Sequence, residues 1–322
     1  MLRNDMNHPV TSTGAAAGPG GQITDLIDQV STIIVGKREQ VALSVICLLA
    51  SGHLLIEDIP GVGKTTLSQA LARSLGLTFS RVQFTADLLP SDLIGVSVYE
   101  RQQEAFVFHP GPVFAQVLLA DEINRAGPRT QSALLEAMEE RQVTAEGQTR
   151  PLPSPFFVIA TQNPAEQLGT HPLPESQLDR FAMRLSLGYP SASAERALLT
   201  GADRRGSLSA LRPVMSAEQW QHWQARVEQV HVSEALLDYL QALLQATRDG
   251  RWFAQGLSPR AGLSLLRLAR ARALVMGRNH VSPEDLQILW VPGVAHRLQT
   301  LSQTGRSAAA QARALLEATP VP

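Results

Sequence analysis

The sequence is poor in cysteine, in aromatic residues and in net charge, and it lacks a long hydrophobic run. Its single cysteine, Cys47, excludes an internal disulfide, so we expect a buried thiol and a reducing compartment. The formal net charge of −1 gives no basic excess, so no nucleic-acid partner is expected. Because no run of about 18 uncharged apolar residues occurs, we expect no membrane insertion and a cytoplasmic protein.

Apolar stretches that alternate with helical patterns dominate the first two thirds of the chain. Residues 1–21, rich in Gly, Ala, Thr and Asn, are expected to be a disordered tail. Short strands are then predicted at 53–58, 78–84, 117–122 and 156–163, with helices between them. This alternation predicts an α/β fold, with a mostly parallel sheet covered by helices on both faces.

Beyond residue 190 the pattern becomes helical. Helices are predicted at 216–230, 233–249, 258–276 and 282–290 and from 306 onward, and Ser233, Ser258 and Ser282 are candidate N-caps. We therefore expect a three-layer αβα core in residues 22–190, a linker in 191–212 and an all-α lid in 213–322. Two alternating runs around a polar turn predict a hairpin at about 94–109 inside the core, and a weaker hairpin signal surrounds Gly147.

The stretch IEDIPGVGKTT, residues 56–66, fits a phosphate-binding loop except that Asp58 stands at the first glycine position. In such loops the backbone surrounds the phosphates at a helix N-terminus, the lysine adds a positive charge, and Ser or Thr ligates Mg²⁺. Lys64 is the predicted cation and Thr65 the predicted metal ligand. The candidate nucleotide-binding residues of this loop are Pro60, Gly61, Val62, Gly63, Lys64, Thr65 and Thr66. An Asn-Lys-x-Asp guanine-reading motif does not occur, so the expected cofactors are ATP and Mg²⁺.

Two acidic residues end the apolar strand VLLADE. Asp121 is a candidate to hold the magnesium through water, and Glu122 is a candidate to orient or deprotonate the attacking water. Acidic residues also form turns after strands, but the phosphate loop upstream strengthens the catalytic interpretation. A pair of carboxylates favours hydrolysis over phosphoryl transfer to a second substrate.

Three further polar residues are candidates for the reaction. Asn163 ends another apolar strand, where its amide either contacts the γ-phosphate or begins a turn before Pro164. Arg180 is either a surface cation or a finger that reaches a neighbouring subunit's γ-phosphate, which would imply oligomerisation. Arg260 lies in the first turn of a helix, where the macrodipole disfavours a cation unless a phosphate lies nearby.

With these motifs in order, the chain resembles the AAA+ ATPases and, within them, the MoxR family. The stretch LLIEDIPGVGKTTL is similar to the family's Walker A, and VLLADEINRAGPRTQSALLEAMEERQVT to its Walker B and following helix. FFVIATQNP resembles sensor 1, LPESQLDRF the arginine-finger region and LSPRAG sensor 2. The resemblance extends from about residue 23 to residue 298.

The resemblance carries further implications. Val35 and Gly36 would lie near the adenine, the hairpin would be the helix-2 insert, and Arg125 and Arg129 become candidates for interface contacts, although exposed cations beside a turn explain them equally well. The assembly would be a hexameric ring that acts as a chaperone-like remodeller of a protein partner, in maturation or cofactor insertion. A von Willebrand factor A (MIDAS) protein is a candidate partner.

Two alternatives stay open from the sequence. The first is a DNA-directed AAA+ machine, such as a helicase loader or transcription activator, which the near-zero charge does not favour. The second is a nucleotide-gated scaffold with little turnover, against which Glu122 argues because a binding-only protein needs no carboxylate to polarise water.

Overall fold

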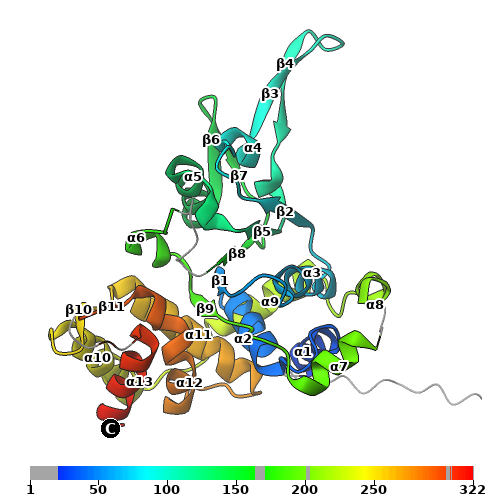
Figure 1. Ribbon diagram of the computed structural model, residues 1–322. Coiled ribbons are helices and arrows are strands. Elements are labelled where there is room, and N and C mark those ends of the chain that lie inside the picture. The colour runs from blue at the N-terminus through cyan, green and yellow to red at the C-terminus, as the bar shows by residue number, and fades with distance from the viewer. Residues whose placement is uncertain (1–20, 164–170, 201–203, 302–304, 306, 322) are drawn as a thin grey trace, which may run out of the picture.

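The computed structural model describes residues 21–163, 171–200, 204–301, 305 and 307–321 (Figure 1). Apart from Gly21, the predicted tail lies outside these residues. The first described element is helix α1 (Gly21–Ile33), and α2 (Arg38–Leu49) follows after a short turn.

Five parallel strands form the central sheet in the order β2-β5-β8-β1-β9. These strands are β1 (Leu54–Glu57), β2 (Phe79–Gln83), β5 (Val117–Asp121), β8 (Phe157–Gln162) and β9 (Met183–Leu185). Four of them are the strands predicted from the sequence. The fifth, β9, was not predicted; it has three residues and pairs with β1 at the edge of the sheet.

Alternate residues of the central strands enter two separate hydrophobic cores. On β1, Leu54 and Ile56 belong to one core and Leu55 to the other. The first core is covered by α1, α2 and α3 (Lys64–Ser74), and the second by α4 (Pro90–Ile94) and α5 (Pro128–Glu140). Strands buried on both faces are continuous apolar runs, as a parallel sheet requires. The predicted αβα layers are therefore confirmed.

Two antiparallel hairpins extend from the second face of the sheet. One consists of β3 (Gly95–Glu100) and β4 (Ala105–Pro110), and the other of β6 (Gln142–Ala145) and β7 (Gln148–Pro151). Figure 1 shows β3 and β4 projecting far beyond the sheet. The backbone N–H of Ser97 donates to the Glu146 carboxylate over 3.1 Å, which joins the two hairpins.

Helices make up most of the chain after β9. The segment expected to be a linker contains α7 (Ala192–Leu199) and α8 (Arg204–Ala210). The helices that follow are α9 (Ala217–Val227), α10 (Glu234–Arg248), α11 (Pro259–Val275), α12 (Pro283–Val294) and α13 (Ala308–Ala318). Ser233, Ser258 and Ser282 are the N-caps of three of them, as predicted. A small antiparallel pair, β10 (Phe253–Gln255) with β11 (Gln299–Thr300), lies within the lid and was not indicated by the sequence.

The lid shares its hydrophobic core with the sheet. Trp220 of α9 is fully buried, and its ring meets that of Phe157 on β8 edge to face at 6.4 Å. Trp223 is also buried, so both tryptophans are core residues. Within the described residues, none of the helices is long and apolar enough to cross a membrane.

A buried histidine directly before β1 links the chain there to strand β8 of the same sheet and to helix α5. The Nδ1 atom of His53 accepts the backbone N–H of Val158 at 2.9 Å, so the ring proton is on Nε2, which donates to the carbonyl oxygen of Met138 at 3.2 Å. Burial lowers the pKa of His53 from 6.5 to about 4, because the charged ring cannot be hydrated there.

His53 therefore predicts a loss of stability in acid. Below pH 6.5 this histidine is protonated in the unfolded chain but stays neutral in the folded chain. The free energy of unfolding therefore falls by about 3 kcal/mol by pH 4. We expect His53→Gln, which keeps a donor and an acceptor but does not titrate, to lose less stability between pH 7 and pH 4 in urea unfolding. Equal losses in the two proteins would contradict the prediction.

Candidate functional site

The predicted phosphate loop connects β1 to α3. Gly61 and Gly63 have φ values of 84° and 99°, a left-handed conformation that favours glycine, and Gly63 is the N-cap of α3. A Cβ atom at either glycine would meet nothing within 4 Å, so open space borders the backbone at this helix N-terminus. That is the geometry in which backbone N–H groups bind an anion.

Asp58 does not need the conformation of the glycine that it replaces. It is absent from the non-glycine residues with positive φ in the described part of the chain, so this position of the loop tolerates a side chain. Its carboxylate is buried and accepts the N–H of Ile59 at 2.9 Å within the loop itself. The departure from the common pattern is therefore compatible with a phosphate loop.

Lys64 is the buried cation of this loop. Its ammonium donates to the carbonyl oxygens of Asp58 at 2.6 Å and Ile59 at 3.3 Å, and to Oδ1 of Asn163 at 3.4 Å. Burial lowers the pKa of Lys64, while the negative charges of Asp58, Asp121 and Glu122 act in the opposite direction. An anionic ligand would add the compensation that a partly desolvated ammonium requires.

The two predicted carboxylates lie at the carboxyl end of β5. Asp121 accepts the hydroxyl of Thr161 at 2.6 Å and the Arg81 guanidinium at 2.6 Å. Glu122 has a φ of 57°, a left-handed conformation that costs a non-glycine residue about 1–2 kcal/mol. Its N–H is held by the Thr161 hydroxyl at 2.9 Å. The fold thus maintains a strained backbone at the residue predicted to polarise water.

The carboxylate of Glu122 has three donors around it. Gln83 donates at 3.0 Å and Arg125 at 2.8 Å to Oε2, and the amide of Asn163 donates at 3.3 Å to Oε1. Asn163 therefore connects Glu122 to Lys64. Of the two options for Asn163, the position beside the phosphate loop agrees with a contact to the γ-phosphate.

These residues line one cavity of about 320 Å³. Its lining consists of Pro60, Gly61, Gly63, Lys64, Thr65, Thr66, Arg81, Gln83, Asp121, Glu122 and Asn163. Backbone amides and an ammonium are suited to phosphate oxygens, and a Thr hydroxyl with a carboxylate is a donor set that Mg²⁺ accepts. The residues present therefore fit a nucleotide with its magnesium, with Thr65 and Asp121 as the metal-side residues.

The sequence analysis did not identify three residues of this site. Arg81 and Gln83 line the cavity, and Thr161 holds Asp121 and Glu122 by hydrogen bonds. Arg81 and Gln83 alternate along β2 and therefore share one face of it, as period-2 spacing requires. Two polar residues at alternate positions of a predicted strand next to the Asp-Glu strand were the available signal. Thr161 carried no such signal, because its role depends on the pairing of β5 with β8.

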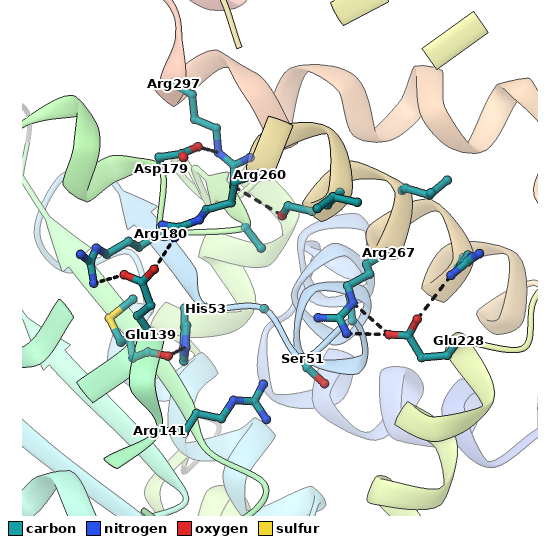
Figure 2. Close-up of a pocket in the computed structure, with 18 residues that line it drawn as sticks. Ser51, His53, Glu139, Arg141, Asp179, Arg180, Glu228, Arg260, Arg267 and Arg297 are labelled. Carbon is teal, nitrogen blue, oxygen red and sulfur yellow. Dashed lines mark hydrogen bonds and ion pairs between the residues drawn. The ribbon is translucent and has the colours of Figure 1, made fainter. Parts of the chain in front are cut away.

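Arg180 and Arg260 do not line this cavity. They lie in a second cavity of about 530 Å³ between the core and the lid. Arg180, which follows the short helix α6 (Glu175–Leu178), pairs with Glu139 of α5 at 2.6 Å and also donates to the carbonyl oxygen of Leu135 at 2.6 Å. Arg260, in the first turn of α11, pairs with the other oxygen of Glu139. Figure 2 shows both guanidinium groups meeting this carboxylate.

The remaining candidates take different positions. Arg125, in the turn η2 (Ile123–Arg125), pairs with Glu122 of its own chain, while Arg129 is exposed in the first turn of α5. Val35 and Gly36 form the exposed turn between α1 and α2. A Cβ at Gly36 would lie 3.4 Å from that of Ala194, so this turn contacts the start of α7 rather than the phosphate cavity.

A phosphate loop and paired carboxylates at the carboxyl edge of a parallel sheet, followed by a helical lid, define the class of P-loop nucleotide hydrolases. Residues 53–183 match the ATPase family associated with various cellular activities (AAA), and residues 245–319 match the AAA lid domain.

Several relatives align along most of the chain. The uncharacterised protein YeaC of Bacillus subtilis is 44% identical over 92% of this chain and 93% of its own length. Chaperone MoxR1 of Mycobacterium tuberculosis is 43% identical over 88% of this chain and 78% of its own. A crystal structure of a Cytophaga hutchinsonii protein superimposes with a TM-score of 0.86 at 35% identity, covering 94% of this chain and 96% of that one.

The chain therefore belongs to the MoxR family of AAA+ ATPases. It is an enzyme that hydrolyses ATP.

Lys64→Ala is expected to abolish nucleotide binding, because it removes the cation of the loop that is predicted to bind the phosphates. Titration calorimetry with ADP measures this, with Ser68→Ala, one turn further along α3, as the control. An unchanged affinity of the Lys64 variant would refute the assignment of the loop.

Glu122→Gln is expected to leave nucleotide binding intact and to slow hydrolysis by about 100-fold or more, since an amide cannot accept the proton of water. Phosphate release measures the rate, and Glu140→Gln, an exposed carboxylate at the end of α5, is the matched control. Hydrolysis by the Glu122 variant at the parental rate would exclude Glu122 as the base.

Proposed function

We propose that the protein assembles into a ring, with six subunits as in the family that it resembles, and binds ATP at the subunit interfaces. The position of Arg180 and Arg260 is the observation that carries this proposal. Both side chains lie outside the cavity of Lys64 and Glu122, and both remain partly exposed, at 28% and 52%. An arginine that stabilises the transition state can be supplied in trans, and in the ring these two arginines would exchange their ion pairs with Glu139 for contacts to a neighbour's γ-phosphate.

Within each cavity, the residues of one chain bind and orient the reactants. Lys64 and the amides of the loop would hold the β- and γ-phosphates, and Thr65 and Asp121 would hold Mg²⁺, whose charge would offset that of the phosphates. Glu122 orients the attacking water and accepts its proton. Asn163 fixes the water against the γ-phosphate, because its amide lies between Glu122 and Lys64.

We infer that ATP hydrolysis drives the remodelling of a protein partner. The β3–β4 hairpin exposes Val96, Val98, Tyr99 and Phe106, and apolar side chains gathered on a projecting element favour contact with another protein. The relative in Mycobacterium tuberculosis is named a chaperone. By this resemblance the partner is a complex in maturation or cofactor insertion, with a von Willebrand factor A protein as the candidate. We place the protein itself in the cytoplasm.

A DNA-directed ATPase is the second candidate. The RuvB subunit of a Holliday junction branch migration complex from Gluconobacter oxydans is 31% identical over 49% of this chain. That similarity spans about half of the chain, whereas the MoxR relatives align along most of it. With a net charge of −1, the protein-directed function is better supported.

The supply of an arginine in trans is tested by mixing two inactive variants. Arg180→Ala subunits retain an intact cavity, and Lys64→Ala subunits retain an intact arginine. At equal mixing we expect up to about a quarter of the parental rate of hydrolysis. This is the fraction of interfaces at which an intact cavity meets a neighbour with an intact arginine.

The control mixture combines Lys64→Ala with Glu122→Gln, two changes in the same cavity, and is expected to stay inactive. Light scattering checks that both mixtures assemble. A mixture of the Arg180 and Lys64 variants that co-assembles but recovers no activity at any ratio would refute the proposal.

A further inference from the structure

Asp58 connects the phosphate loop to a segment far along the chain. Besides the bond to Ile59, its second carboxylate oxygen accepts the backbone N–H of Gly188 at 2.7 Å and the hydroxyl of Ser186 at 3.1 Å. Its own N–H donates to Gln162 at the end of β8, and its carbonyl oxygen accepts from Lys64. The residue at the first glycine position is therefore a junction between the loop and the segment that follows β9.

That segment leads to the turn predicted to lie near the adenine. The carbonyl oxygen of Tyr189 accepts the ammonium of Lys37 at 2.7 Å, and Lys37 directly follows Val35 and Gly36. Gly188 has a φ of 61°, which turns the chain sharply between the bonds to Asp58 and to Lys37. Continuous contacts thus run from the phosphate loop through Asp58 to the turn between α1 and α2.

This segment carries an exposed aromatic side chain, that of Tyr189. Tyr189 is 78% exposed, so its ring is open to solvent. The ring follows directly after the N–H that Asp58 holds. The backbone of Tyr189 is bound to Lys37 beside the turn of Val35 and Gly36, and an exposed aromatic ring on this segment is suited to stacking against a nucleobase.

We propose that Asp58 is a positioning residue for the base: it fixes the segment of Gly188 and Tyr189 against the phosphate loop, so that base and phosphates are bound together. The proposal rests on the proposed function, in which this cavity binds ATP. A glycine at position 58 would leave the Gly188 N–H and the Ser186 hydroxyl without their acceptor. The segment would then be free to move relative to the loop, and the base would contribute less to affinity.

The negative charge of Asp58 allows a clear test, because its removal has opposite effects on two affinities: it favours the binding of phosphate and weakens the binding of the base. A carboxylate beside Lys64 repels phosphate, so removing it should not weaken the binding of a ligand that is only phosphate. The loss of the link to Gly188 should weaken the binding of a ligand that also carries a base. A role in the folding of the loop alone would weaken both ligands together.

The experiment compares Mg²⁺-ADP with Mg²⁺-pyrophosphate by titration calorimetry, since these ligands share a diphosphate and differ in the adenosine. For Asp58→Gly we expect about tenfold weaker binding of ADP, the usual effect of losing hydrogen bonds to a charged group, with pyrophosphate unchanged or tighter. Asp58→Asn keeps one acceptor oxygen, and we expect it to restore part of the ADP affinity. This near-isosteric variant also serves if the glycine variant does not fold.

Glu57→Gln is the matched control. Glu57 precedes Asp58, but its ion-pair partner, Arg184 at 2.7 Å, lies within β9 and not in the segment that follows it. We expect its ratio of ADP to pyrophosphate affinity to equal that of the parent.

Three results would overturn the inference. The first is an equal loss of affinity for both ligands in Asp58→Gly. The second is a ratio of ADP to pyrophosphate affinity that is unchanged in both Asp58 variants. The third is a parent protein that binds ADP no more tightly than pyrophosphate. A parent that binds neither ligand would instead refute the nucleotide site itself, and so the proposed function.

Discussion

A buried ammonium at the end of a parallel sheet is the interaction on which the candidate site depends. Lys64 is 8% exposed, and its charge is compensated by two carbonyl oxygens of its own loop, by the amide oxygen of Asn163 and by nearby carboxylates. Because the carboxyl ends of β1, β5 and β8 lie side by side in a parallel sheet, the loop after β1 meets the carboxylates at the end of β5 and the amide after β8 at one edge. The sheet order therefore determines which residues can act on a phosphate.

Much of this arrangement follows from local sequence. The strands ending at Glu57, Asp121 and Gln162 are apolar runs bounded by polar residues, and the β3–β4 hairpin is two alternating runs around a polar turn. Such signals are complete within a few residues, so the sequence predicts them. The edge strand β9 could not be predicted, because three residues are too few to show the alternation typical of a strand. Met183 and Leu185 do have a polar residue between them.

The parts that could not be predicted depend on contacts between distant residues. Asp58 looks like a defect in a motif, and its purpose becomes visible only when Gly188, 130 residues later, lies against it. The same holds for Glu139, an unremarkable acidic residue on an amphipathic helix, which binds both Arg180 and Arg260. Local pattern identifies each arginine as a candidate, but it carries no information about the carboxylate between them.

The contacts around Arg180 also connect the lid to the proposed subunit interface. Directly after Arg180, the carbonyl oxygen of Phe181 accepts from His296 at 2.8 Å and from Arg297 at 2.7 Å, both in the lid turn η3 (Ala295–Arg297). Burial lowers the pKa of Arg297 to about 10, yet Asp179 opposes that effect, so the guanidinium stays charged and keeps its hold on the carbonyl at neutral pH. Any rotation of the lid must therefore move the backbone beside Arg180 or break two buried hydrogen bonds. In a ring where Arg180 acts on a neighbour's nucleotide, the orientation of one lid would thus affect hydrolysis in the next subunit through a carbonyl group and two side chains.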